Sequence, residues 1–582
     1  MLRYNDNTKT LDDLISNSEY VFFDIFDTLI TRPFLSPKDL FFFIENQYCT
    51  PGFYKSRVVA EKKARESKEE TTIDEIYQNI DPIYKKFQEI EENLEIELCY
   101  AIKHNFVKYK GSLSLGKKIF FVSDMYLKEE TILAILNKNG YEANSDNLFL
   151  SSKYKKTKHT GSLYKLAIQT IGIQDPSSIV MFGDNKKSDA DIPKSLGMKA
   201  FHYTPSQSNL EQNKLNTFIK KNIKNQNSLS PLLKIILEKQ IDNKDYWYKI
   251  GYKIAGPIVY SYVRFIIGQA NNSDSNPFLL FVGRDGYLLN KCLQRLDPSL
   301  AHQYIYAPRS IADQILKGYS QSIASTYKSY IFSKFDTRKK VFIVDSRTEN
   351  FSAQRLIQEV LNKKVIGIYW DIIKTNNMHE IFDHIAYQNN DSKISVWRLF
   401  EYLITSPEPP IKTINKNLDI IYSKSPQEAS RARDYENIEN GCMSFINDLQ
   451  KRFNKNLPLI FYSNITDYVN NFLSNPDKED IQKFSTALIA ADKNHVKYTP
   501  FLSCKFNIQK PLSSIKNIST CHWLTPCQIF LLNIFHPIQI CFKRKKWKFY
   551  SLQNLRTSAF LSVLICGNFI QQLALVELAN YS

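Results

Sequence analysis

The first part of the chain alternates short apolar runs with longer amphipathic stretches. The runs are rich in Phe, Val and Ile and too short for helices, which is typical of buried parallel strands. We expect strands at 20–24, 118–123, 147–151, 178–184 and 199–203, and helices between them, such as 127–139 and 161–171. This alternation predicts an α/β fold, a doubly wound, Rossmann-like parallel sheet with its site at the carboxyl ends of the strands.

A long insertion, about 36–114, separates the first expected strand from the second. It is dense in Glu, Lys, Ala and Leu at helical spacing, which predicts a helical cap over the edge of the sheet. After the first domain, 1–205, the range 206–245 turns to Asn, Gln, Lys and Ser around one helical patch. Such a composition predicts a linker.

A second α/β pattern occupies 246–414. Its apolar runs predict strands at 278–282, 303–306, 340–345 and 365–369, with helices at 287–295 and 352–361. The last part of the chain, 415–582, is helical and irregular in pattern and contains no internal repeat. We therefore expect a second α/β domain followed by a mostly helical C-terminal region.

Length and composition agree with this division. A chain of 582 residues exceeds what one hydrophobic core supports, so two to four domains are expected. The hydrophobic share of 43% and the charged share of 23% are those of an ordinary globular protein and exclude a disordered or fibrous one.

The net charge of +17 changes the picture little. Lysine is scattered among Asn, Ile and Tyr rather than gathered in one arm, so we expect no specific nucleic-acid partner. A basic surface attracts anionic substrates.

Near the C-terminus, the apolar run 529–542 precedes the basic run 543–548. This segment is interpreted either as a buried helix pair broken at Pro537 or as a peripheral membrane contact.

Cysteine usage and the N-terminus favour a cytoplasmic protein. The nine cysteines form no CxxC pair and no regular disulfide framework, which favours a reducing compartment. The segment MLRYNDNTKT lacks the apolar core of a secretory signal, and no uninterrupted apolar stretch is long enough to span a membrane.

Residues that can carry chemistry follow four of the expected strands. Asp24, with Thr28 shortly after it, ends the first; Ser123 ends the second; Lys155, Lys156 and Lys158 follow the third; Asp184 and Asp189 follow the fourth. A carboxylate at a strand end can attack phosphorus, and Asp24, Asp184 and Asp189 supply the oxygen ligands that Mg²⁺ prefers. The set is suited to metal-assisted phosphoryl transfer to or from a small phosphorylated substrate.

These segments resemble the four motifs of the haloacid dehalogenase (HAD) superfamily, in order and on the expected strands. The motifs are VFFDIFDTLITR, KKIFFVSDMYL, KHTGSLY and VMFGDNKKSD. The resemblance implies that Asp24 is the nucleophile, that Ser123 and Lys158 bind phosphoryl oxygens, and that Asp184 and Asp189 hold Mg²⁺ with Asp24. It also implies that the insertion is a cap that selects the substrate. The candidate substrates are small phosphorylated metabolites, among them sugar phosphates.

A wider resemblance extends over about 15–410. The segments RVVAEKKARE, GYKIAGPIVYSYV and FVGRDGYLL are similar to a bacterial subgroup of two-domain HAD-like proteins associated with surface polysaccharide biosynthesis. This similarity concerns biological context rather than chemistry.

One position departs from the superfamily's phosphatases. They carry a general acid and base two residues after the nucleophile, where this chain has Phe26, with Asp27 one position later. Three interpretations stay open. The chain is a hydrolase or phosphotransferase that acts through an Asp24 adduct, with Asp27 as a candidate for the vacant acid role, or a catalytically degenerate binding or scaffold protein. The third is a carbon-centred hydrolase like the dehalogenases, which have an aromatic residue at that position. The pair Asp184 and Asp189 argues against the last, since dehalogenation needs no Mg²⁺.

Two further charged groups have alternative interpretations. Arg57, Glu61 and Arg65 share one face of a cap helix and form either a salt-bridged ladder or a substrate-facing row. In the second domain, residues 284–285 and Asp345 follow expected strands and are either loop caps or parts of a second ligand site.

Overall fold

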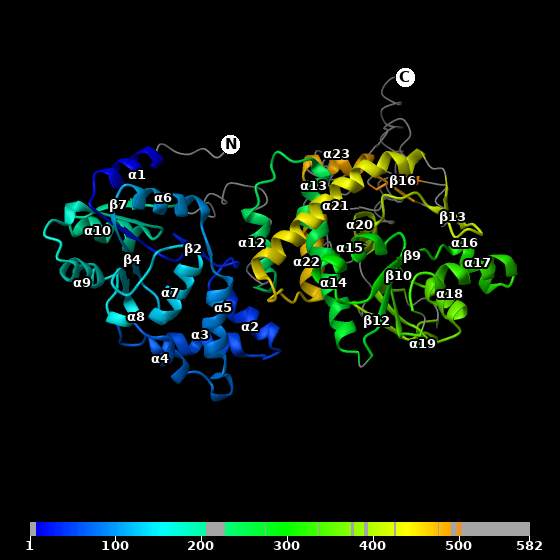
Figure 1. Ribbon diagram of the computed structural model, residues 1–582, viewed down its shortest axis with the longest axis horizontal. Coiled ribbons are helices and arrows are strands. Elements are labelled where there is room, and N and C mark those ends of the chain that lie inside the picture. The colour runs from blue at the N-terminus through cyan, green and yellow to red at the C-terminus, as the bar shows by residue number, and fades with distance from the viewer. Residues whose placement is uncertain are drawn as a thin grey trace, which may run out of the picture. The chain divides into compact units, whose positions relative to one another are not determined.

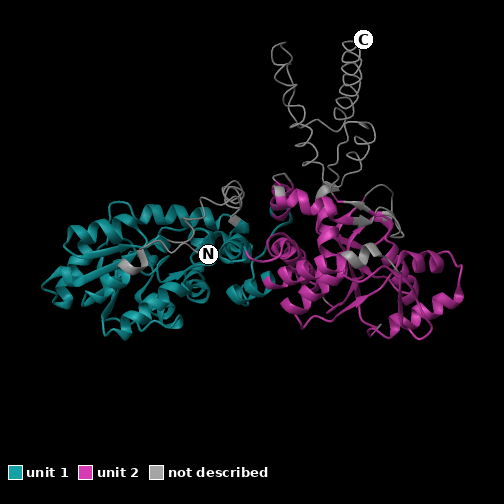
Figure 2. Cartoon of the chain, turned by 90° about the horizontal axis from the view of Figure 1, so that it is seen from above, with its two compact units in different colours: residues 1–242, 445–464 teal, residues 243–444, 465–582 magenta. Residues whose placement is uncertain are grey.

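The structure is a computed structural model that describes residues 7–204 and 227–501, with short gaps at 274, 337, 374–377, 389–393, 424–425, 475 and 491–497. The chain divides into two compact units, coloured separately in Figure 2. Unit 1 comprises residues 1–242 and 445–464, and unit 2 comprises residues 243–444 and 465–582. Residues 445–464 lie inside the range 415–582, which was predicted as one C-terminal region, but they belong to unit 1.

Unit 1 is built on a parallel sheet of five strands in the order β5-β4-β1-β6-β7. Two of them, β4 and β7, are labelled in Figure 1. The strands are β1 (Tyr20–Phe23), β4 (Lys118–Ser123), β5 (Leu148–Leu150), β6 (Ile179–Gly183) and β7 (Lys199–His202). Each lies within one or two residues of its predicted bounds. The central strand β1 pairs on both sides, with Phe23 opposite Phe121 of β4 and opposite Phe182 of β6. The α/β fold class predicted from the sequence is confirmed.

Helices cover this sheet as the alternating pattern predicts. Apolar side chains of Phe22, Val122 and Met181 pack with Leu163 and Ala167 of α9 in one buried cluster. The covering elements are α1 (Asn7–Ser16), α6 (Lys103–Ser114), α7 (Glu129–Lys138), α8 (Ser151–Tyr154), α9 (Ser162–Ile171), η2 (Pro176–Ser178), the π-helical turn η3 (Lys186–Asp191) and α10 (Ile192–Ser195). This layer leaves the carboxyl ends of the strands to loops.

The insertion between β1 and β4 is helical, as expected. It begins after β2 (Ile30–Thr31), which pairs antiparallel with β3 (Tyr100–Ala101). Between them lie α2 (Asp39–Gln47), α3 (Phe53–Ala64), α4 (Ile73–Gln78), η1 (Pro82–Tyr84) and α5 (Phe87–Leu98). The later part of the range 36–114 is α6, which packs against β4 of the sheet. We use the name cap for residues 36–98.

The charged row on α3 forms a salt-bridged ladder. Arg57 contacts Glu61 at 3.0 Å, and Arg65 contacts Glu61 at 3.1 Å. Arg57 is fully buried and also binds both oxygens of Glu91 on α5, at 2.8 Å each. Its guanidinium therefore holds two cap helices together and is not available to a substrate.

Unit 2 contains a second parallel sheet of five strands in the order β12-β11-β10-β8-β9. The strands are β8 (Phe278–Val282), β9 (His302–Ile305), β10 (Val341–Thr348), β11 (Ile366–Ile372) and β12 (His384–Ala386). The first four match the predicted ones, with β10 and β11 about three residues longer at their carboxyl ends. The pattern did not reveal β12, a short edge strand.

The remaining described elements are mostly helical. They are η5 (Asn227–Leu229), α12 (Ser230–Glu238), α13 (Tyr246–Ile250), η6 (Gly251–Ala255), α14 (Gly256–Asn271), α15 (Gly286–Leu296), α16 (Arg309–Leu316), α17 (Gln321–Phe332), α18 (Ser352–Leu361), α19 (Met378–Ile381), α20 (Ile394–Ile404), β13 (Ile411–Ile414), β14 (Ile420–Tyr422), α21 (Pro426–Phe453), α22 (Tyr462–Ser474), α23 (Lys478–Thr486), β15 (Leu488–Ala490) and β16 (Tyr498–Pro500). The helix α12 falls in the range predicted as a linker, and most of its side chains are buried.

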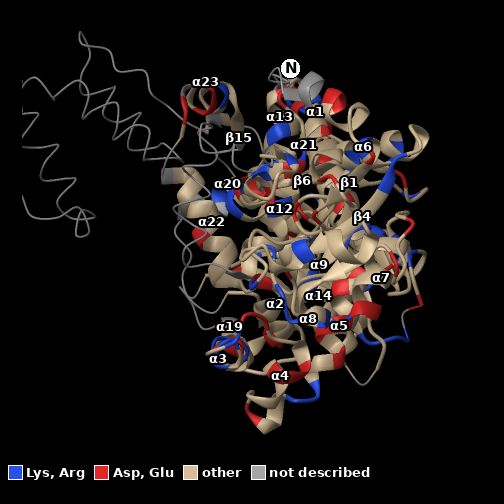
Figure 3. Ribbon diagram, turned by 90° about the vertical axis from the view of Figure 1, so that its left-hand side faces the viewer, with Lys and Arg blue, Asp and Glu red and all other residues tan. Residues whose placement is uncertain are grey.

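The distribution of charged residues and the possibility of membrane contact were both considered from the sequence. Figure 3 shows basic and acidic residues interspersed along the ribbon in this view, in agreement with the scattered lysines of the sequence. No helix in the described part of the chain is long and apolar enough to cross a membrane. The run 529–548, considered above for peripheral membrane contact, lies outside the described residues.

Candidate functional site

The carboxyl edge of the first sheet brings together residues from distant parts of the sequence. Asp24 directly follows β1, and its backbone N–H donates to the carbonyl oxygen of Phe182 in β6 at 2.9 Å. Ser123 ends β4 and is buried, and Asp184 directly follows β6. The parallel register places all three at one edge of the sheet, because the strands on either side of β1 end at nearly the same level.

Asp24 is held from two sides. Its Oδ1 accepts a hydrogen bond from Lys158 Nζ at 2.5 Å, and its Oδ2 accepts one from Thr28 Oγ1 at 3.1 Å. The Thr28 hydroxyl also lies 3.2 Å from Asp184 Oδ1. Asp24 is only 6% exposed and Lys158 4% exposed, so this ion pair is buried. An Asp held in one orientation by a lysine and a hydroxyl is suited to act as a nucleophile.

Asp189 completes the group from the turn that follows β6. Its Oδ1 lies 2.7 Å from Lys158 Nζ, and its Oδ2 accepts from the backbone N–H of Asn185 at 3.0 Å. Any side chain at Gly183 would collide with Asp189, so glycine is needed where the strand meets the turn. The turn is the π-helical segment η3, a geometry frequent at functional sites.

The carboxylates Asp24, Asp184 and Asp189 carry more negative charge than their surroundings neutralise. Burial raises the pKa of the Asp24 carboxyl, and although Lys158 lowers it, Asp189 and Asp184 raise it further. Burial also raises the pKa of Asp184, as do the charges of Asp27 and Asp189. Burial lowers the pKa of Lys158, but Asp24 and Asp189 raise it by more and favour the ammonium.

This charge excess fits a divalent cation. With all groups ionised, three carboxylates against Lys158 leave a formal charge of −2 in a buried place. One oxygen from each of Asp24, Asp184 and Asp189 lies within 4.8 Å of the others. Oxygen donors of this kind are the ones that Mg²⁺ takes, usually with several waters. The residues present therefore fit the ion that the sequence predicts.

The three lysines that follow β5 have different surroundings. Lys155 and Lys156 are exposed, and Lys155 Nζ contacts Glu75 of the cap at 3.2 Å. Only Lys158 turns inward to Asp24. Its backbone N–H donates to Asp124 Oδ1 at 2.7 Å, which anchors the loop to the end of β4. The structure thus brings Lys158 to the site and leaves its two neighbours at the surface.

Phe26 and Asp27 lie in the turn after Asp24. The Arg32 guanidinium lies 4.2 Å from the centroid of the Phe26 ring, and Glu95 of α5 binds that guanidinium at 2.8 Å. Asp27 has a left-handed backbone conformation, with φ of 55°, and its Oδ1 accepts a hydrogen bond from Thr31 Oγ1 at 2.9 Å. Asp27, the carboxylate next to the position where phosphatases carry the general acid, is thus bound to the Thr31 hydroxyl.

The sequence reasoning missed several supporting residues. Tyr164 donates to the carbonyl oxygen of Ser188 at 2.9 Å and lies 3.4 Å from Asp189 Oδ1, so it supports the turn η3. The aromatic residue in KHTGSLY was its only signal. Asp124 binds the backbone N–H groups of Lys158 and His159, a long-range contact for which the sequence carries no signal.

The edge of the second sheet also gathers charged side chains. Asp285 follows β8 and accepts hydrogen bonds from Ser346 Oγ and from Thr405 Oγ1, the latter at 3.3 Å. Burial raises the pKa of Asp345 to about 7, with Asp285 adding to the shift, and burial with Asp285 likewise raises the pKa of Glu401 to about 7. Among described residues, the one group of three metal-ligating side chains close enough to share an ion is Asp24, Asp184 and Asp189.

Comparisons with known proteins add little to this geometry. A scan against family models and a search of curated proteins each find no match. One similar solved structure is L-2-haloacid dehalogenase from Xanthobacter autotrophicus, with a TM-score of 0.26 and 13% identity; the match covers 35% of this chain and 88% of that chain. Another is a HAD family enzyme from Bacteroides thetaiotaomicron, with a TM-score of 0.25 and 15% identity; the match covers 34% of this chain and 100% of that chain.

Proposed function

We propose that unit 1 is a Mg²⁺-dependent hydrolase or phosphotransferase of the HAD type that acts on a small phosphorylated metabolite through an Asp24 adduct. The observation that carries this proposal is the buried cluster in which Lys158 lies 2.5 Å from Asp24 and 2.7 Å from Asp189, with Asp184 beside them. A buried ion pair of this kind contributes little to stability once desolvation is counted, so a catalytic role explains it better.

Each residue has a distinct task in this mechanism. Asp24 attacks phosphorus, an oxygen–phosphorus bond forms, and the leaving oxygen departs with the bonding electron pair. Lys158 neutralises charge on Asp24 and on the phosphoryl oxygens, and Ser123 offers a hydroxyl to them. Asp24, Asp184 and Asp189 would hold Mg²⁺, which when bound supplies charge compensation for the dianionic phosphoryl group. Water then cleaves the aspartyl phosphate, returning Asp24 and releasing phosphate.

The leaving oxygen needs a proton unless it is already a good leaving group. Phe26 cannot supply one, and Asp27 is bound to Thr31. We therefore propose a preference for aryl or acyl phosphates, whose leaving groups depart as stable anions. This same feature supports the second candidate function, a degenerate HAD-like protein that binds a phosphorylated ligand without turnover.

The test is hydrolysis of p-nitrophenyl phosphate and acetyl phosphate by the full chain with and without Mg²⁺. We expect turnover that depends on Mg²⁺ and phosphate incorporated on the peptide containing Asp24 when the reaction is quenched in acid. Binding of beryllium fluoride without turnover of either ester would favour the degenerate binding protein. If the chain neither hydrolyses an ester nor binds beryllium fluoride, both candidate functions are wrong.

A further inference from the structure

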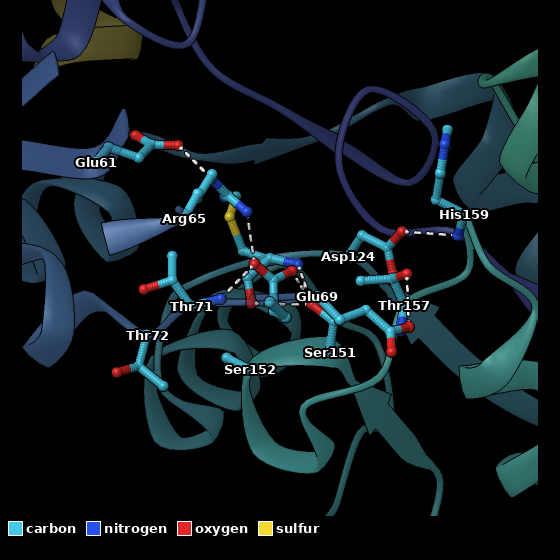
Figure 4. Close-up of polar contacts among 12 residues, drawn as sticks. Glu61, Arg65, Glu69, Thr71, Thr72, Asp124, Ser151, Ser152, Thr157 and His159 are labelled. Carbon is cyan, nitrogen blue, oxygen red and sulfur yellow. Dashed lines mark hydrogen bonds and ion pairs between the residues drawn. The ribbon is translucent and has the colours of Figure 1, made fainter. Parts of the chain in front are cut away.

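A carboxylate of the cap reaches the loop that carries Lys158. Glu69 lies in the segment between α3 and α4, and its Oε1 accepts hydrogen bonds from that loop (Figure 4). The backbone N–H and the hydroxyl of Thr157 lie 2.9 Å and 3.0 Å from Oε1. The hydroxyls of Thr160 and Ser162 lie 2.5 Å and 2.6 Å from it. The residues that bind Glu69 therefore flank Lys158 in the sequence, with Thr157 before it and Thr160 and Ser162 after it.

The neighbouring glutamate binds Ser151 at the start of α8, and Ser151 in turn binds the loop after β4. Glu70 is buried, and its Oε2 accepts from the hydroxyl of Ser151 at 2.6 Å. The same Ser151 hydroxyl accepts from the backbone N–H of Met125, at 2.8 Å, one residue beyond Asp124. Arg65 Nη1 holds Glu70 at 2.6 Å. The segment 65–72 of the cap is therefore bound directly to the loop of Lys158 and to Ser151, which links it to the loop after β4.

The charge of Glu69 matters to this contact. Its hydrogen bonds with Ser162 and Thr160 lower the pKa of the Glu69 carboxyl to about 2, so it is ionised across the working pH range. A carboxylate accepts hydrogen bonds more strongly than a neutral oxygen. Lys158, by contrast, makes its own contacts inward, to Asp24, Asp189 and Asp124. Glu69 fixes the outer side of the loop while these contacts fix the inner side.

We propose that Glu69 is a positioning residue through which the cap holds Lys158 against Asp24. The cap then contributes to the reaction step as well as enclosing the substrate. Lysine has a long flexible side chain, and small displacements of a catalytic group have large effects on rate. The kinetic part of this inference rests on the proposed function, whereas the contact between cap and loop does not.

The test compares two variants with a matched control. Glu69→Ala removes the acceptor, Glu69→Gln retains an oxygen acceptor without the charge, and Glu66→Ala removes an exposed glutamate of the same segment that binds no loop residue. With Mg²⁺ and p-nitrophenyl phosphate, Glu69→Ala should lower kcat about 10- to 100-fold, as losses of supporting contacts do. We expect kcat/KM to fall equally, the sign of an interaction needed in the transition state. Glu69→Gln should recover part of the rate, and Glu66→Ala should match the parent.

Amide hydrogen exchange provides a readout independent of activity. Because the N–H of Thr157 donates to Glu69, the peptide covering 155–162 should exchange faster in Glu69→Ala than in the parent and in Glu66→Ala. Unchanged exchange and unchanged kcat in Glu69→Ala would overturn the inference, as would equal changes in Glu66→Ala. If the parent hydrolyses no ester, the proposed function fails, and the exchange result still decides whether Glu69 holds the loop.

Discussion

The carboxyl edges of the two parallel sheets have similar composition but different pairing of charges. At the edge of unit 1, Lys158 is shared by Asp24 and Asp189, with Asp184 close to both. At the edge of unit 2, two guanidinium groups each bind one carboxylate. Arg347 binds Asp371 at 3.0 Å, and Arg398 binds Glu401 at 3.0 Å. Both sheets thus gather ionisable side chains where doubly wound folds present ligands.

The difference teaches that the way in which carboxylates are paired with cations, rather than the presence of charge, distinguishes the two edges. In unit 1 three carboxylates exceed one lysine in a buried place, an arrangement that a divalent cation stabilises. In unit 2 guanidinium groups bind Asp371 and Glu401, and hydroxyls bind Asp285. Burial and the charge of Asp285 raise the pKa of Asp345 to about 7. The same parallel architecture therefore places three carboxylates around one lysine in unit 1, and in unit 2 it places carboxylates against separate guanidinium groups and hydroxyls.

The largest expected effect separates the two edges by activity. Asp24→Asn retains the shape of the side chain but removes the negative charge of the nucleophile, so turnover of p-nitrophenyl phosphate should be abolished. Asp345→Asn, at the edge of unit 2, should leave turnover unchanged. Both rates are measured on purified full chain with Mg²⁺. Retained turnover in Asp24→Asn would make the proposed mechanism wrong.

The next effect concerns metal affinity. Asp184→Ala removes one of few carboxylates around the proposed ion and should weaken Mg²⁺ binding by about 100-fold or more, since losses of outer partners alone cost 10- to 100-fold. Asp345→Asn is again the control, and EDTA should abolish turnover in the parent. Calorimetry gives the affinities. Equal Mg²⁺ affinity in parent and Asp184→Ala would place the ion elsewhere.

A smaller effect is expected at Phe26. A general acid contributes about 10²- to 10⁴-fold, so Phe26→Asp should raise turnover of an alkyl phosphate more than that of p-nitrophenyl phosphate. The gain is expected to be at the lower end, because the Phe26 ring now packs under Arg32. Asp27→Asn should change little if Asp27 only binds Thr31. Loss of alkyl turnover in Asp27→Asn would instead identify Asp27 as the acid.

The last effect is on stability alone, leaves activity unchanged and concerns unit 2. Asp345 has a pKa of about 7 in the folded protein against an ordinary 3.8, so the folded state binds more protons between these values. Stability of the parent should fall as pH rises from about 4 to about 7 and then level off. Asp345→Asn lacks this titration and should gain stability relative to the parent across that window, by at most about 4 kcal/mol at 1.36 kcal/mol per pKa unit.

Thermal unfolding of parent and Asp345→Asn at several pH values measures this difference. Thr413→Ser, in the same unit and with no titratable group, is the control for substitution itself. Parallel stability curves for parent and Asp345→Asn between pH 4 and pH 7 would contradict the raised pKa. Activity at fixed pH should not follow these changes, since they lie outside unit 1.

Much of the fold is predictable from local pattern. The strands of the first sheet and four strands of the second follow from apolar runs between turn residues, because burial on both faces of a parallel sheet leaves few polar positions. The edge strand β12 carries only part-buried residues and has no such run. The burial of α12 was not predictable either. The helix lies in a mostly polar range, and nothing in the local sequence indicates which part of the chain it packs against.

The sequence by itself determined the α/β class, the helical insertion and the set of acids, hydroxyl and lysines at strand ends, since these depend on residue type and short periodicity. The motif KHTGSLY favoured Lys158 among the three lysines. Only the tertiary structure decided that its ammonium contacts both Asp24 and Asp189, how Gly183 admits Asp189, and that Glu69 of the cap binds the Lys158 loop. Those contacts join residues far apart along the chain. They depend on backbone register and burial, and a polar run such as SKEETT is the same in sequence whether it meets solvent or another loop.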